Sequence, residues 1–303
     1  MRPKRVLCIQ DISCVGRCSL TVMLPALSAM GLQACPLPTA LLSTHPSGFA
    51  APVRTDETAF CRSALDAYDA QGIKFDAILS GFLASPAQAD LVEKALRQNP
   101  AALKLIDPVM ADGGRLYSGT TPALCDALRA LCRHADVLTP NVTESAMLLN
   151  LPPDDAPMDS AALTARICAL HAAYPLTRCL VITGVRHTDG RSGNALLCAN
   201  GENTVNSAAA LCSFGDENAA ADFSIWFFPY EAVPQSYPGT GDLFAAVLAG
   251  GLLMHGDARR SVQDAAAFVS SVASYTLQSG GEPRFGVQLE PLLRQLCPPV
   301  PLP

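Results

Sequence analysis

The sequence predicts an α/β fold in three layers, with a central, mostly parallel sheet and helices on both of its faces. Short apolar runs alternate along the chain with longer segments of helical periodicity. Strands that read as continuous apolar runs are typical of parallel sheets, because both of their faces are buried. No internal repeat or long linker divides the 303 residues, so we expect one domain over residues 1–303.

The elements follow in chain order. Strands are expected at 5–10, 77–80, 103–106, 136–138 and 179–183. Helices are expected between them at 20–30, 57–71, 86–98, 122–132 and 160–174. The last third changes rhythm, with a strand meander at 194–198, 204–205 and 224–228 and two helices at 241–255 and 258–278. Residues 215–222 are small and acidic and predict a surface loop, and residues 297–303 form a Pro-rich tail that cannot be helical.

Polar clusters follow five of the expected strands. In an open parallel sheet, ligands bind beyond the carboxyl ends of the strands. The clusters are Asp11, Ser80-Gly81-Phe82, Asp107-Pro108, Thr139-Pro140-Asn141 and Thr183-Gly184. Each is a weak signal alone, but together they predict one ligand site at that edge of the sheet.

The most informative motif is the turn Pro238-Gly239-Thr240-Gly241-Asp242, which leads directly into an apolar helical run. Two glycines let the backbone approach a ligand closely, and the helix that starts there presents unpaired amides and a partial positive charge. Such a site attracts a phosphate, yet it also carries the carboxylate of Asp242. An acid beside an anion site is useful if it handles a proton while phosphate moves, so we expect phosphoryl transfer to an alcohol.

Other polar residues allow two interpretations each. Asp107 and Asp112 fit a Mg²⁺ site that bridges nucleotide phosphates, or a turn in which Asp-Pro starts the bend. Asn141 and Glu144 fit a helix cap, which leaves open whether Glu144 also lies near the metal.

Two residues with ring side chains, Phe82 and His45, also allow two interpretations each. Phe82 fits either the core or a stack on a flat ligand ring, and His45 fits either a solvated turn or a substrate contact.

Composition and absent motifs exclude several classes of protein. A net charge of −6 with four lysines and no basic run disfavours a nucleic-acid partner. The twelve cysteines are scattered and contain no C-x-x-C pair, which disfavours a disulfide framework or a structural zinc site. No P-loop, dinucleotide fingerprint, protein-kinase set or hydrolase elbow occurs. The longest apolar run is shorter than a membrane helix needs, and we expect a cytoplasmic protein without a membrane partner.

With these motifs, the chain resembles the ribokinase-like superfamily and, within it, pyridoxal (vitamin B6) kinases, over residues 5 to 281. The resemblance rests on Ile9-Gln10, Ser80-Gly81-Phe82-Leu83, Asp107-Pro108-Val109-Met110, Thr139-Pro140-Asn141 to Glu144, and the 238–242 turn. It implies a homodimeric, ATP-dependent kinase that phosphorylates the 5′-hydroxymethyl group of pyridoxal, pyridoxine or pyridoxamine.

The resemblance also implies roles for particular residues. Asp242 would accept the hydroxyl proton, and the amides of Gly239, Thr240 and Gly241 would stabilise the moving phosphoryl group. Mg²⁺ and a monovalent cation such as K⁺ would be organised by Asp107, Asp112 and Glu144. Nucleotide contacts would come from Asp107, Asn141, Glu144, Thr183, Phe228 and Tyr230. Substrate contacts would come from Asp11, His45, Ser47 and Phe82.

Two departures from the pyridoxal kinase pattern leave the substrate less defined than the reaction. Many members have Gln-Ser-His where this chain has Gln10-Asp11-Ile12, and Asn-His-Thr where it has Thr44-His45-Pro46. The nearest rival is a hydroxymethylpyrimidine kinase, although those enzymes commonly have Cys at the position of Asp242. The sequence also leaves open a sugar kinase and a non-catalytic, ligand-binding relative. The intact turn and its acid count against a non-catalytic relative.

Overall fold

The computed structural model of the protein describes residues 2–199 and 223–298. In these residues, nine strands form one sheet in the order β11-β10-β9-β8-β5-β4-β1-β2-β3. Their bounds are β1 Arg5–Val15, β2 Gln33–Thr44, β3 Arg54–Asp56, β4 Ala77–Ser80, β5 Leu103–Ile106, β8 Val137–Leu138, β9 Cys179–Arg186, β10 Ser192–Ala199 and β11 Phe223–Tyr230. The six strands from β9 to β2 are parallel, and β3, β10 and β11 pair antiparallel at the two edges.

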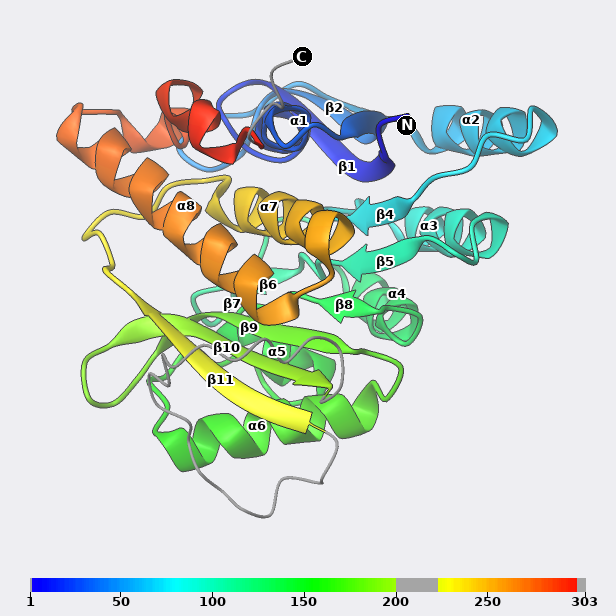
Figure 1. Ribbon diagram of the computed structural model, residues 1–303. Helices are drawn as coiled ribbons and strands as arrows, with labels where there is room; N and C mark the ends of the chain where they lie inside the picture. The colour runs from blue at the N-terminus through cyan, green and yellow to red at the C-terminus, as the bar shows by residue number, and fades with distance from the viewer. Residues whose placement is uncertain (1, 200–222, 299–303) are drawn as a thin grey trace.

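Helices cover both faces of this sheet (Figure 1). One face packs against α2 (Thr58–Ala70), α3 (Pro86–Gln98), α4 (Pro122–Cys132), α5 (Val142–Leu148) and α6 (Ser160–Ala173). The other face packs against α1 (Leu20–Ala29), α7 (Thr240–His255) and α8 (Ala258–Gln278). Two buried apolar clusters, one on each face, therefore hold the layers together, as the continuous apolar strands predict. The predicted three-layer α/β fold is confirmed.

Short elements complete the described structure. A two-stranded ribbon, β6 (Ala111–Asp112) and β7 (Arg115–Leu116), follows β5, and two 3₁₀ turns, η1 (Pro283–Phe285) and η2 (Glu290–Leu296), follow α8. None of the helices in the described residues combines the length and apolarity that a bilayer crossing requires. The predicted strand at 204–205, the acidic loop at 215–222 and tail residues 299–303 lie outside the described residues.

The structure corrects one part of the expected strand pattern. The first strand does not end before Asp11 but continues to Val15, and it pairs along its whole length with β2, which the sequence pattern did not indicate. The register shifts between Gln10 and Ile12, so Asp11 lies at an irregularity inside the strand pair rather than in a loop. Such bulges re-aim a side chain within a continuing ladder.

Candidate active site

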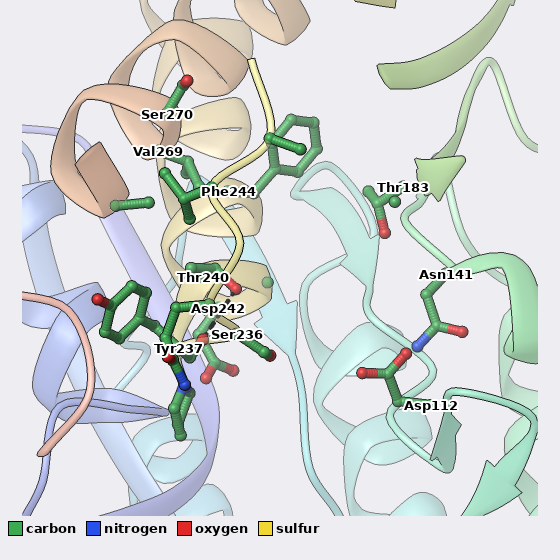
Figure 2. A pocket seen from close by; sticks show the side chains of 18 of the residues that line it. Asp112, Asn141, Thr183, Ser236, Tyr237, Thr240, Asp242, Phe244, Val269 and Ser270 are labelled. Atoms are coloured by element: carbon green, nitrogen blue, oxygen red, sulfur yellow. Dashed lines mark hydrogen bonds between the residues drawn. The ribbon is translucent and has the colours of Figure 1, made fainter. Parts of the chain in front are cut away.

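A cavity of about 630 Å³ opens at the carboxyl ends of the parallel strands, where the polar clusters were predicted to meet. Figure 2 shows Thr240 and Asp242 of α7 on one side of it, and Asp112, Asn141 and Thr183 on the other. Eleven residues of the predicted site line this cavity. They are Ser47, Asp107, Asp112, Asn141, Glu144, Thr183, Tyr230, Gly239, Thr240, Gly241 and Asp242.

The Gly-Thr-Gly-Asp turn forms the N-terminus of α7. Gly239 occupies the N-cap position with φ 87° and ψ −4°, a left-handed conformation that glycine adopts without strain. A Cβ at Gly239 would lie 2.3 Å from the carbonyl oxygen of Arg17, so a larger residue would force the backbone to shift. A Cβ at Gly241, in contrast, would meet no atom within 4 Å. Gly239, Thr240 and Gly241 all line the cavity, and no side chain caps the first amides of the helix.

Asp242 lies half-buried in the first turn of α7, and its Oδ2 accepts a hydrogen bond of 2.7 Å from the backbone amide of Ser19. Burial raises the pKa of Asp242, against the hydrogen bonds from the Ser19 amide and the Gln10 side chain. A helix N-terminus favours the ionised form of a carboxylate, and burial acts in the opposite direction. A carboxylate with a raised pKa is a better proton acceptor than an ordinary aspartate.

A second helix N-terminus, that of α5, faces the same cavity but is closed by its own side chains. Asn141 Oδ1 accepts from the Glu144 amide at 2.9 Å, and Glu144 Oε2 accepts from the Asn141 amide at 3.0 Å. Glu144 Oε1 accepts from the Met110 amide at 3.0 Å, which fastens the helix to the loop after β5. The predicted capping box is confirmed, and Glu144 nevertheless lines the cavity.

Acidic side chains are concentrated in the lining of the cavity. Burial and then the neighbouring carboxylates of Glu144 and Asp242 raise the pKa of Asp107 well above its ordinary range. Burial also raises the pKa of Glu144 to about 8, although three backbone amides donate to that carboxylate. Buried acids that are not neutralised by a basic side chain attract a cation or a proton.

The donor set fits Mg²⁺ bound mainly through its ligand and water. Mg²⁺ in phosphoryl-transfer sites is commonly held by one or two carboxylates together with waters and substrate phosphates. In the described residues, no three acidic, His or Cys side chains form a ready-made metal cluster. Both oxygens of Glu144 already accept from amides, and Asp112 Oδ1 accepts from Gly113 N. Asp107 would therefore be the best direct ligand for a cation, and Glu144 and Asp112 would act through water.

The remaining predicted residues, Asp11, His45, Phe82 and Phe228, do not line the cavity. Asp11 is buried, and its Oδ1 accepts from the Ser19 hydroxyl at 2.6 Å. His45 is buried too and bonds to the Arg284 carbonyl oxygen at 2.7 Å, so the interpretation as a solvated turn histidine is wrong. Phe82 lies under the Arg54 guanidinium, 5.8 Å from its ring centroid.

The part of the cavity wall formed by α7 and α8 is largely apolar. Phe228 packs into the core cluster shared with α7 and α8, whereas Tyr230 reaches the cavity at the end of the same strand. Small and apolar residues of α7 and α8 complete the wall: Phe244, Ala266, Val269 and Ala273. Such a surface suits the flat face of a nucleobase.

Two residues of the site were missed by sequence reasoning. Asn194 lines the cavity from β10, and its Oδ1 accepts from the Gly184 amide at 3.2 Å. Asn194 lies in an otherwise apolar strand, and apart from its polarity no sequence motif marks it as a site residue. Ser19 precedes an apolar helical run, so the sequence predicts an ordinary helix cap at this position. Nothing in the local pattern indicates that Ser19 contacts Asp242.

Comparison with known proteins agrees with this geometry. The sequence profile of the family described as phosphomethylpyrimidine kinase matches residues 24–285. A pyridoxal kinase structure from Lactobacillus plantarum is 30% identical, with a TM-score of 0.82 over 97% of this chain and 96% of that one. A structure from Bacteroides thetaiotaomicron, named after phosphomethylpyrimidine kinase and crystallised with pyridoxal, is 29% identical, with a TM-score of 0.80 over 99% and 98%.

A curated relative points the same way. The pyridoxine/pyridoxal/pyridoxamine kinase of Bordetella avium is 28% identical over 286 residues, which cover 89% of this chain and 85% of that protein. The profile match extends over most of the chain, and the fold is the one that the sequence resemblance implied. The chain therefore belongs to the phosphomethylpyrimidine kinase family, within the ribokinase-like superfamily.

Proposed function

We propose that this protein is an ATP-dependent kinase that phosphorylates the 5′-hydroxymethyl group of pyridoxal, pyridoxine or pyridoxamine. The observation that carries the proposal is the open N-terminus of α7, with unpaired amides and a half-buried acid in one turn. Phosphoryl transfer depends on positioning and charge stabilisation more than on a strong base, and this turn supplies both. The relatives named for B6 vitamers support the choice of substrate.

Asp242 is the proposed proton acceptor. The Ser19 amide fixes one of its oxygens, which leaves the carboxylate oriented toward the cavity. As the substrate oxygen forms its bond to the γ-phosphorus, the bond from that phosphorus to the bridging oxygen of ADP breaks. The hydroxyl proton passes to Asp242. The helix amides after Gly239 stabilise the charge on the transferring group, because they are fixed in place before the reaction.

The nucleotide is expected to lie along the rest of the cavity. Thr183, Asn141 and Asn194 offer polar groups for its phosphates, and the wall formed by Tyr230, Phe244 and α8 suits adenine. Asp107 would hold Mg²⁺, with Glu144 and Asp112 acting through water and a monovalent cation nearby. Bound there, Mg²⁺ would neutralise phosphate charge that an acidic site otherwise repels.

The substrate alternative is a hydroxymethylpyrimidine kinase, and the name of the matching family, phosphomethylpyrimidine kinase, supports a pyrimidine substrate. ADP formation with pyridoxal, pyridoxine, pyridoxamine and hydroxymethylpyrimidine separates the two. We expect turnover with at least one B6 vitamer and loss of that turnover in Asp242→Asn. Turnover of the pyrimidine alone would assign the hydroxymethylpyrimidine kinase, and no turnover of any of the four would reject both.

We further propose that residues 1–303 act as one kinase domain in a cytoplasmic homodimer, in line with the pyridoxal kinase resemblance. Size-exclusion chromatography with light scattering tests the assembly. A mass near twice 31.8 kDa is expected, and a mass near 31.8 kDa at assay concentrations contradicts the dimer.

A further inference from the structure

Ser19 has an unusual backbone for its place in the fold. It stands at the N-cap of α1, where a serine normally has an extended backbone and its hydroxyl accepts from a first-turn amide. Here φ is 53° and ψ is −134°, and the side chain makes no capping hydrogen bond. A non-glycine residue at positive φ costs free energy and persists only where its surroundings enforce it, often at functional sites.

Both hydrogen-bond donors of Ser19, the amide and the hydroxyl, bind acids instead. Its backbone amide donates to Asp242 Oδ2 at 2.7 Å, and its hydroxyl donates to Asp11 Oδ1 at 2.6 Å. Hydrogen bonds to carboxylates are stronger than those between neutral groups, and these two are short. Since Ser19 is only 7% exposed, water does not compete freely for either bond.

The segment before Ser19 is fixed against the catalytic turn. The Arg17 carbonyl oxygen lies 2.3 Å from where a Cβ would stand on either Gly239 or Gly286. The Arg17 amide donates to the Phe285 carbonyl oxygen at 3.0 Å. The backbones of Gly239 and Gly286 therefore hold residues 16–19, including Ser19, next to the N-terminus of α7.

We propose that Ser19 is a positioning residue, which orients the Asp242 carboxylate through its amide and is itself held in place by the Asp11 carboxylate. The hydroxyl bond to Asp11 stabilises the unfavourable backbone conformation, and that conformation directs the amide toward Asp242. Asp11 then acts on the reaction through Ser19, in addition to any contact it makes with a substrate. This inference rests on the proposed kinase function.

Substitutions at Ser19 distinguish this role from a purely structural one. Alanine loses the hydroxyl and keeps the cost of positive φ, whereas glycine loses the hydroxyl but adopts the same backbone freely. We expect Ser19→Ala to lower kcat about tenfold and Ser19→Gly about threefold, with KM for ATP changed less than about twofold. Ser28→Ala, at an exposed position of the same helix, is the matched control and should retain full activity. A larger loss in Ser19→Gly than in Ser19→Ala, or a loss confined to KM, overturns the proposal.

A double-mutant cycle tests whether Ser19 acts through Asp242. In an Asp242→Asn background, Ser19→Ala should change the residual kcat less than about twofold, because the carboxylate that it orients is gone. An equal loss in both backgrounds contradicts the proposal.

A crystal structure of Ser19→Ala gives a readout that does not depend on the substrate. The Asp242 carboxylate should leave its wild-type orientation, and an unmoved carboxylate overturns the inference even if the wild-type protein phosphorylates none of the four substrates. Inactivity of the wild-type protein, by contrast, rejects the proposed function alone.

Discussion

Two helix N-termini face the same cavity, and each carries an acid in its first turn, yet their first amides are satisfied in different ways. In α5, Asn141 and Glu144 satisfy each other's amides, and Glu144 also accepts from the loop after β5. In α7, Gly239 caps the helix without a side chain, and Asp242 is bound from outside by Ser19. A helix N-terminus whose amides are bound by its own side chains has a structural role, whereas an N-terminus with unpaired amides can bind an anion.

The largest expected effect is on Asp242. Replacing a general base typically costs about 10²- to 10⁴-fold in rate, so kcat of Asp242→Asn should fall by about that factor. The melting temperature should stay equal or rise, because a half-buried charge has been removed. Steady-state ADP formation and thermal unfolding measure the two quantities. Near-full activity would show that the open helix end works without its acid.

The next effect concerns the cap of α7. A Cβ on Gly239 meets the Arg17 carbonyl oxygen at 2.3 Å, while Gly256, at the other end of the helix, also has a positive φ but lies in open space. Gly239→Ala should therefore lower the free energy of unfolding by about 2–4 kcal/mol and also reduce kcat. Gly256→Ala should cost only about 1–2 kcal/mol. Urea unfolding of both variants measures the difference, and equal costs would contradict the close approach of residues 16–19.

A smaller effect is expected at Glu144. Glutamine at this position can still accept from the Asn141 amide, as in an ordinary capping box. Glu144→Gln should therefore change the free energy of unfolding by less than about 1 kcal/mol and lower kcat by less than about tenfold. A loss as large as that of Asp242→Asn would mean that the α5 acid takes part in the reaction directly.

The last effect is a pH dependence of stability without metal. The folded-state pKa of Glu144 is raised to about 8 and that of Asp11 to about 6, so the folded protein holds protons that the unfolded chain releases. Stability is then fullest below the unfolded values near pH ~4 and falls as pH rises through about 6 and about 8. The melting temperature in EDTA should decrease from about pH 5 to about pH 9. In Glu144→Gln, the melting temperature should change less with pH in the upper part of this pH range. A melting temperature that increases over this range contradicts the raised pKa values.

Much of the fold was readable from the sequence, because central parallel strands are short apolar runs. The expected strands at 77–80 and 103–106 coincide with β4 and β5, and the helices at 86–98, 122–132 and 258–278 coincide with α3, α4 and α8. β2 was not readable, since Pro36 and Pro38 interrupt it and its stability comes from pairing with β1. The continuation of β1 past Asp11 depends on the same pairing.

The candidate site divides in the same way. Asp107, Asn141 and Thr183, on or just after β5, β8 and β9, line the cavity together with the α7 turn, because the sheet brings these strands side by side, whereas Phe82 after β4 does not line it. Asp11 and His45 were assigned to loops, and long-range partners, Ser19 and the Arg284 carbonyl, hold them away from the cavity surface. Contacts across 8 and 239 residues that depend on a strand irregularity and on a C-terminal turn leave no local pattern to read.

The most direct test compares the two acids in one assay, at saturating ATP and pyridoxal. If α7 carries the reaction and α5 has a structural role, kcat of Asp242→Asn falls at least about a hundredfold while that of Glu144→Gln stays within about tenfold of wild type. Equal losses in the two variants, or the larger loss in Glu144→Gln, would contradict the assignment of the open helix end as the centre of phosphoryl transfer.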